Sequence, residues 1–351
     1  MKTVVVDKVA SVAQHNSLAD DVRLSSSIPC EEGVLIAARV LNNKSRYNQL
    51  ELTSGRMATV TAGDVVVGAL GHRNALRGYS GRLPEAVAVG DTVQLLNIGG
   101  VMGLCDSANP DVGPPFNCEV LGAVLHFPYL GERIGVPARV GEETLASDAA
   151  LDTAGVPVVA LAGTCMDSGK TAAACAVVGR LRHLGKTVAA CKATGVSLRR
   201  DILAMQDAGA SSAMIFSDLG VVTTTEANGP ALTRTLLTRL AASRPDVIVL
   251  ELGDGLLGSY GVEAILTDSD VKKALTAVLL CANDPVAAWG GAQILREQHG
   301  IEPAVVTGPA TDNAVGVEQI ESRLSLPAIN ALSNAVELGD HVAARLWAET
   351  T

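Results

Sequence analysis

The sequence predicts a two-domain protein of the α/β class, in which a doubly wound, mostly parallel sheet follows a smaller, β-rich, barrel-like domain. Three observations lead to this prediction. The 351 residues exceed what one average domain needs, which favours two domains. The composition is 48% hydrophobic with only 3% aromatic residues and 35 glycines, as is typical of parallel sheets covered by helices. Along the chain, closely spaced strands give way to alternating strands and helices.

Residues 1–130 are predicted to form the β-rich domain. From about Gly33 to Phe127, short apolar runs are separated by turns rich in glycine and polar residues, with no helical pattern between them. The expected strands are residues 34–40, 49–52, 57–60, 64–70, 92–96 and 119–126. Residues 131–155 are polar and interrupted by Gly and Pro, so we expect them to connect the two domains.

Residues 156–351 are predicted to form the doubly wound domain. The expected strands are 158–163, 187–191, 213–216, 247–250, 277–280 and 304–307. The expected helices are 170–184, 198–208, 231–242, 286–298 and 314–324. This alternation specifies a parallel sheet covered on both faces, with ligands bound beyond the carboxyl ends of the strands.

A glycine-bracketed loop follows the first of these strands and opens a helix. It reads Gly163-Thr-Cys-Met-Asp-Ser-Gly169-Lys170-Thr171. In such a loop the backbone N–H groups point at an anion, the lysine adds a positive charge and the threonine hydroxyl can hold Mg²⁺. The sequence therefore predicts a nucleotide-type phosphate site formed by Gly163, Thr164, Asp167, Ser168, Gly169, Lys170 and Thr171.

Charged residues also follow the neighbouring strands. Glu251 comes directly after strand 247–250, as a Walker B carboxylate would, and is expected to bind Mg²⁺ directly or through water. Asp254 in the next turn is a second candidate. Lys192 comes directly after strand 187–191, where its charge can neutralise a phosphate or a substrate carboxylate. Asp201 begins a helix, either as a favourable first-turn charge or as a second Mg²⁺ ligand.

Charge and targeting signals narrow the class of partner. The net charge of −10 argues against nucleic acid or an anionic membrane as the main partner. The N-terminus lacks the apolar region of a signal peptide, and no apolar run is long enough to span a bilayer. Seven cysteines without a C-x-x-C pair favour reduced thiols. We therefore expect a soluble, cytoplasmic protein with a small-molecule substrate.

The phosphate loop resembles that of dethiobiotin synthetase. Five residues separate Gly163 from Gly169, whereas the commonest phosphate loop has four. The loop, the Lys192-Ala-Thr-Gly195 segment, the segment from Asp201 to Gln206 and the strand into Glu251 follow in that family's order over residues 157–307. The resemblance implies that Lys170, Thr171, Asp201 and Glu251 surround Mg-ATP, with Thr171, Asp201 and Glu251 on the metal and Lys192 at the acceptor.

The two-domain layout also resembles the DUF1611 proteins, in which an N-terminal domain precedes a similar loop. The matching segments are Ala193-Thr194-Gly195 and the glycine-rich stretch from Glu251 to Gly261. Some of those proteins are linked to N-acyl transfer onto D-amino acids. This resemblance implies an acyltransferase as an alternative function.

The ordered residues predict an enzyme that uses Mg-ATP to phosphorylate or activate a small carboxylate- or amine-derived metabolite. It would act as a kinase, and so a transferase, or as a ligase, with Lys170, Lys192 and Glu251 as catalytic residues. Two alternatives stay open: an N-acyltransferase that uses acyl-CoA on an amino acid, and a regulatory nucleotide-binding protein without turnover. We expect a homodimer, with the β-rich domain serving in oligomerisation or covering the site.

Overall fold

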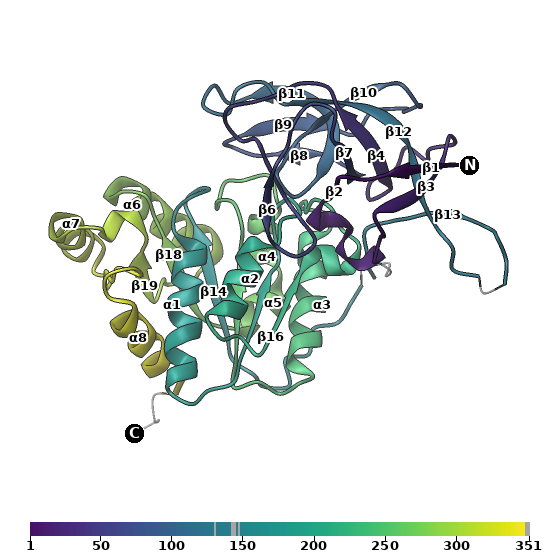
Figure 1. Cartoon of the computed structure of the whole chain (residues 1–351). Helices are drawn as coiled ribbons and strands as arrows, with labels where there is room; N and C mark the ends of the chain where they lie inside the picture. Colours follow the sequence, from purple (N-terminus) through teal and green to yellow (C-terminus); the bar gives the residue numbers. More distant parts are fainter. Residues whose placement is uncertain (130, 142–144, 147, 348–351) are drawn as a thin grey trace. The chain divides into compact units, whose positions relative to one another are not determined.

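The computed structural model describes residues 1–129, 131–141, 145–146 and 148–347 (Figure 1). The chain divides into two compact units. Unit 1 consists of Met1–Thr144, Val196–Arg200 and Phe216–Thr223, and unit 2 consists of Leu145–Gly195, Asp201–Ile215 and Thr224–Thr351. The predicted fold class is confirmed, since one unit is rich in antiparallel strands and the other is built on a parallel sheet.

Unit 1 contains a closed barrel. Strand β12 (Phe116–His126) pairs with β4 (Leu35–Val40), β4 pairs with β7 (Val65–Leu70), and β7 pairs with β11 (Val101–Ala108). Strand β10 (Thr92–Leu95) pairs with both β11 and β12, and so completes the ring. Closure removes the exposed edges that an open antiparallel sheet would leave. Strand β10 is thus the element that closes the predicted barrel-like domain.

Further strands extend the barrel. They are β1 (Lys2–Val5), β2 (Lys8–Val9), β3 (Asp21–Ser25), β8 (Arg73–Asn74), β9 (Tyr79–Arg82) and β13 (Val136–Pro137), and a separate hairpin joins β5 (Gln49–Glu51) to β6 (Met57–Thr59). The sequence patterns predict neither β1–β3 nor β8, β9 and β11. These strands are short or carry polar residues on exposed positions, so their apolar alternation is weak.

Unit 2 is a six-stranded sheet in which every pairing is parallel. The strand order is β16-β15-β17-β14-β18-β19. The bounds are β14 (Val158–Gly163), β15 (Val188–Lys192), β16 (Ser212–Ile215), β17 (Val247–Glu251), β18 (Leu275–Cys281) and β19 (Val305–Thr307). The chain leaves β14 toward one edge and later returns to its other side, so the order switches at β14. Ligands bind at such a switch point in open α/β sheets.

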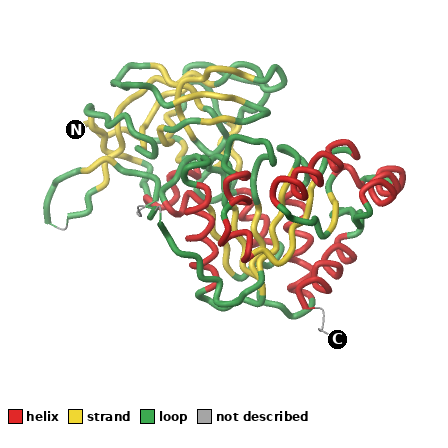
Figure 2. Tube along the Cα trace, turned by 180° about the vertical axis from the view of Figure 1, so that it is seen from behind, coloured by secondary structure: helices red, strands yellow, loops and turns green. Residues whose placement is uncertain are grey.

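Helices cover both faces of this sheet (Figure 2). They are α1 (Lys170–His183), α2 (Arg200–Asp207), α3 (Gly229–Ala241), α4 (Val262–Thr267), α5 (Ser269–Ala274), α6 (Pro285–Gln293), α7 (Ala314–Leu324) and α8 (Ala335–Trp347). Helices α1, α2 and α8 share one core with alternate strand residues such as Val159 and Val249. The intervening residues Ala160 and Leu250 are equally buried, as expected for strands covered on both sides. Within the described residues, none of the helices combines the length and apolarity needed to cross a bilayer.

Candidate functional site

The loop that joins β14 to α1 brings the predicted phosphate-site residues together. Gly169 directly precedes α1 and adopts a φ of 87°, and Asp167 has a φ of 59°. These left-handed conformations turn the chain sharply into the helix. A Cβ atom on Gly163 would lie 2.5 Å from Ser168 Oγ and 2.7 Å from Lys170 Nζ. The first glycine therefore makes room for the loop to fold over its own lysine.

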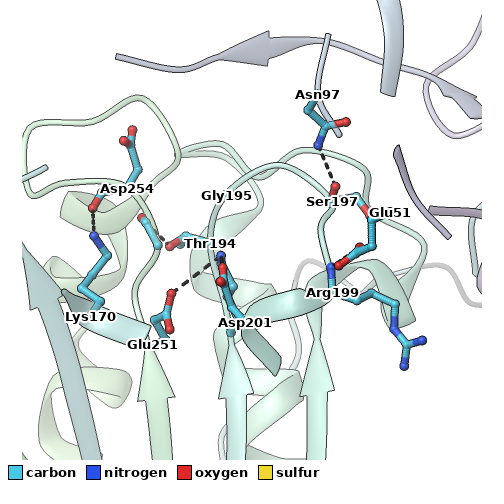
Figure 3. Close-up of polar contacts among 12 residues, drawn as sticks. Glu51, Asn97, Lys170, Thr194, Gly195, Ser197, Arg199, Asp201, Glu251 and Asp254 are labelled. Atoms are coloured by element: carbon cyan, nitrogen blue, oxygen red, sulfur yellow. Dashed lines mark hydrogen bonds and ion pairs between the residues drawn. The ribbon is translucent and has the colours of Figure 1, made fainter. Parts of the chain in front are cut away.

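Lys170 folds back into this loop and is only 6% exposed. Its ammonium donates to the carbonyl oxygens of Cys165, at 2.8 Å, and of Asp254, and lies 3.3 Å from Ser168 Oγ (Figure 3). In the part of the chain that the structure describes, Lys170 forms no ion pair. Neutral oxygens thus hold a buried positive charge at the N-terminus of a 14-residue helix. This arrangement favours an anion.

A second cluster of charges lies at the ends of the adjacent strands. Lys192 and Glu251 are register partners on β15 and β17. The Lys192 ammonium contacts the Asp201 carboxylate and lies 3.7 Å from Glu251 Oε1. Burial raises the pKa of Glu251, while the nearby charge of Lys192 lowers it. The predicted residues Lys192, Asp201 and Glu251 therefore meet in one charge network; Figure 3 labels its two carboxylates, Asp201 and Glu251.

The two clusters adjoin each other. The charge of Lys170 and a hydrogen bond from the Thr171 side chain also act on the Glu251 carboxyl group, and both lower its pKa. Glu251 is 2% exposed, and its Oε2 has no hydrogen-bond partner among the described residues. An unsatisfied buried oxygen of this kind is costly unless a cation or a donor completes it.

These oxygens suit a hard cation. The described residues contain no group of three or more His, Cys, Asp or Glu side chains arranged to hold a metal. Mg²⁺ commonly uses one or two carboxylates together with waters and substrate phosphates, so a dedicated protein cage is not needed. The carboxylates of Glu251 and Asp201 and the Thr171 hydroxyl are the oxygen donors near the loop that could hold such a cation.

The glycine-rich segment after β17 packs directly on the loop that joins β14 to α1. A Cβ atom on Gly255 would lie 2.7 Å from Thr164 O, and one on Gly253 would lie 2.4 Å from Thr194 O. Thr194 Oγ1 donates to Gly253 O at 2.9 Å. Asp254, the second acidic candidate, is 7% exposed and has a φ of 69°. These close approaches explain why this turn is built from glycines.

Sequence reasoning missed two residues next to the loop. Asn283 follows β18 and its Nδ2 donates to Cys165 Sγ at 3.2 Å, while Thr307 ends β19. Asn283 Oδ1, Thr307 Oγ1 and Thr164 Oγ1 are buried and have no hydrogen-bond partner among the described residues. Their position in the sequence could have identified them, because both residues stand at or just beyond the carboxyl end of a predicted strand, where ligands bind in α/β sheets.

Comparisons with known proteins give likenesses in structure only. No protein-family model matches the chain, and no curated protein matches it. Among solved structures, chloroplast FtsY from Physcomitrella patens is 15% identical, with 59% of this chain and 71% of that chain covered and a TM-score of 0.40. Hydrogenase maturation factor HypB from Archaeoglobus fulgidus is 15% identical, with 55% and 91% covered and a TM-score of 0.39.

A ParA family ATPase from Chlorobium tepidum is 14% identical, with 55% of this chain and 99% of that chain covered and a TM-score of 0.34. We therefore assign the candidate site from the geometry of this chain alone.

Proposed function

We propose that unit 2 binds ATP with Mg²⁺ and phosphorylates or activates a small carboxylate- or amine-derived metabolite, as a kinase or a ligase. The observation that carries this proposal is the buried Lys170 ammonium, held by neutral oxygens within a helix-opening loop beside the Glu251, Lys192 and Asp201 network. The order of these residues along the chain is also that of dethiobiotin synthetase, which motivates the reaction class.

The charge balance of the site argues for a metal. Two cationic side chains, Lys170 and Lys192, lie among three acidic ones, Glu251, Asp201 and Asp254, so the five together carry a net charge of −1 when all are ionised (2 − 3). A nucleotide with several phosphate charges needs an added cation in such surroundings. Thr171, Asp201 and Glu251 would hold Mg²⁺, which would neutralise phosphate charge.

The remaining roles follow from position. Lys170 would bind phosphate oxygens together with the N–H groups at the start of α1. Lys192, on β15 beside Glu251 of β17, would place its charge near the group being transferred. Catalysis in this arrangement consists mainly of positioning and charge stabilisation.

An N-acyltransferase would use the same loop for a phosphate of acyl-CoA, as the DUF1611 resemblance suggests. That reaction needs no metal, so it gives the two carboxylates no task. A regulatory ATPase of the MinD type would carry an extra lysine near the start of the loop, where this chain has Thr164, Cys165 and Met166. Magnesium-dependent catalysis remains the proposal that uses every charged residue at the site. The homodimer and the cytoplasmic location stay predictions from the sequence.

Isothermal titration with ATP and Mg²⁺ tests this proposal. Lys170→Ala removes a charge-assisted hydrogen bond to phosphate and is expected to weaken binding by about 10- to 100-fold. Lys273→Ala, which removes an exposed lysine from α5, is the matched control and should bind like wild type. Parallel titrations with GTP, and with acetyl-CoA in EDTA, separate the alternatives. The proposal fails if wild type does not bind ATP, or if Lys170→Ala binds it equally well.

A further inference from the structure

The segment that leads into Asp201 belongs to a different unit from the residues on either side of it. Residues 196–200 are part of unit 1, whereas Gly195 and Asp201 are part of unit 2. Asp201 is also the second residue of α2, which begins at Arg200. The segment 196–200 of unit 1 therefore leads directly into the first turn of the helix that carries Asp201.

Unit 1 grips the backbone of this segment at several points. Asn97 Nδ2 donates to Ser197 O at 2.7 Å, and Ser197 N donates to Val222 O at 2.9 Å. A Cβ atom on Gly99 would lie 1.9 Å from Ser197 O, so that position requires glycine. At the other end, Arg199 N donates to Glu51 Oε2 at 2.7 Å (Figure 3). The last anchored atom thus lies two residues before Asp201.

Glu51 is an unusual anchor. It is fully buried at the end of β5, and it also accepts a hydrogen bond from the Ser11 hydroxyl. Among the described residues it forms no ion pair, and its Oε1 has no hydrogen-bond partner. A carboxylate in such surroundings is costly to bury. What it gains over a neutral side chain is a stronger, charge-assisted bond to the Arg199 N–H.

We propose that Glu51 is a positioning residue for the metal side of the candidate site. It holds the start of α2 and so keeps the Asp201 carboxylate beside Lys192 and Glu251, while touching neither nucleotide nor metal itself. The inference rests on the proposed Mg-nucleotide function. It adds that the β-rich unit sets the response of the site to Mg²⁺, through a chain of contacts from Glu51 to Arg199 and along the backbone to Asp201.

The test compares nucleotide binding with and without metal. The dissociation constant of a fluorescent ATP analogue is measured in Mg²⁺ and in EDTA. The dissociation constant in EDTA divided by that in Mg²⁺ gives the Mg²⁺ coupling. Glu51→Ala should lower this ratio by about tenfold, the effect of one lost charge-assisted hydrogen bond, with little change in EDTA. Glu51→Gln keeps an acceptor for Arg199 N and should stay within about threefold of wild type.

A stability control separates positioning from general damage to unit 1. Asp64 is another largely buried carboxylate of unit 1. It accepts a hydrogen bond from Thr61 N at 2.7 Å and forms an ion pair with Lys8 at 2.6 Å. Among the described residues, the Asp64 side chain has no hydrogen bond or ion pair with segment 196–200, so Asp64→Ala should destabilise unit 1 and leave the Mg²⁺ coupling unchanged. An equal loss of coupling in Asp64→Ala, or full coupling in Glu51→Ala, would overturn the proposal.

A ligand-free measurement completes the design. Amide hydrogen exchange in residues 196–200 and at the start of α2 should become about tenfold faster in Glu51→Ala, while α1 stays as in wild type. Unchanged exchange in these residues would also overturn the anchoring. If the proposed function itself is wrong, wild type will bind no nucleotide in either buffer, which overturns both claims and is distinct from a defect confined to the Glu51 variants.

Discussion

Lys44, a residue outside the candidate site, shows how burial tunes a single amine. Its Nζ lies 4.9 Å from the centre of the Tyr79 ring and 5.5 Å from that of Phe116, and it donates to the Tyr79 hydroxyl. Burial lowers the pKa of Lys44 to about 8, against a smaller opposing effect of Cys105. The phenol stays protonated, because burial raises the pKa of Tyr79 to about 12.

We predict that Lys44 reacts with acetic anhydride with a half-maximal rate near pH 8, as followed by mass spectrometry of its peptide. A model lysine peptide in the same tube, with a pKa of about 10.4, is the control. Because the unfolded chain holds this proton more tightly than the folded one, this group alone makes the fold relatively more stable as the pH rises from about 8 to about 10. A labelling midpoint near that of the model peptide would contradict the lowered pKa.

The sequence alone singles out Gly163, Lys170 and Glu251 as candidate site residues, because each stands in a local pattern of strand, turn and helix. It does not single out Glu51, because the contact of Glu51 with Arg199 joins residues that are 148 positions apart in the chain. The local pattern of apolar and polar residues predicts where strands end. Contacts between segments that are distant in the chain leave no such periodic pattern in the sequence.

At the scale of elements, α8 shows tertiary packing overriding weak local signals. It lies beside α1 and shares its core, with Leu338 and Val342 fully buried (Figure 1). Arg180 on α1 donates two hydrogen bonds to the Asp340 carboxylate, from Nε to Oδ1 at 2.7 Å and from Nη2 to Oδ2 at 3.1 Å. The sequence patterns do not predict this helix, because Gly339 interrupts it. A Cβ atom there would lie 2.3 Å from Arg180 Cβ, so the glycine weakens the helix locally but lets the two helices meet.

We predict that Val342→Ala destabilises unit 2 by about 2 kcal/mol, because two buried methyl groups are lost and a cavity remains. Val336→Ala is the matched control on the same helix, since Val336 is 58% exposed, and it should change stability by less than about 0.5 kcal/mol. Urea unfolding followed by tryptophan fluorescence suits this test, because Trp289 and Trp347 both belong to unit 2. Equal effects of the two variants would show that α8 does not cover the core.

At the scale of the whole molecule, the chain passes between the two units five times, after residues 144, 195, 200, 215 and 223. The sequence predicts one β-rich stretch followed by one α/β stretch, and the main part of each unit follows that order. It gives no sign that residues 196–200 and 216–223 pack with the β-rich unit. Both are short links between strands and helices of the parallel sheet, and their partners are set only in the folded molecule.

Val222 makes this interleaving testable. It is fully buried in the core of unit 1, and a Cβ atom on Gly71 would lie 2.9 Å from its Cγ1. We predict that Val222→Ala lowers the free energy of unfolding of unit 1 by about 2 kcal/mol. Amides of β4 and β7 that exchange through opening of this unit should then exchange roughly 30-fold faster. Val89→Ala, at a half-exposed position of unit 1, is the control and should have little effect.

The amide exchange rates of β14 and β17 show whether the two units unfold independently or as one cooperative structure. If the units open independently, amides in these two strands will keep wild-type rates in Val222→Ala, because their own core is intact. We expect this result, since the barrel and the parallel sheet each enclose a hydrophobic cluster of their own. An equal acceleration in β14 and β17 would instead mean that the shared segments make the two units one cooperative structure. Unchanged rates in β4 and β7 would show that the segment 216–223 contributes nothing to the stability of the barrel.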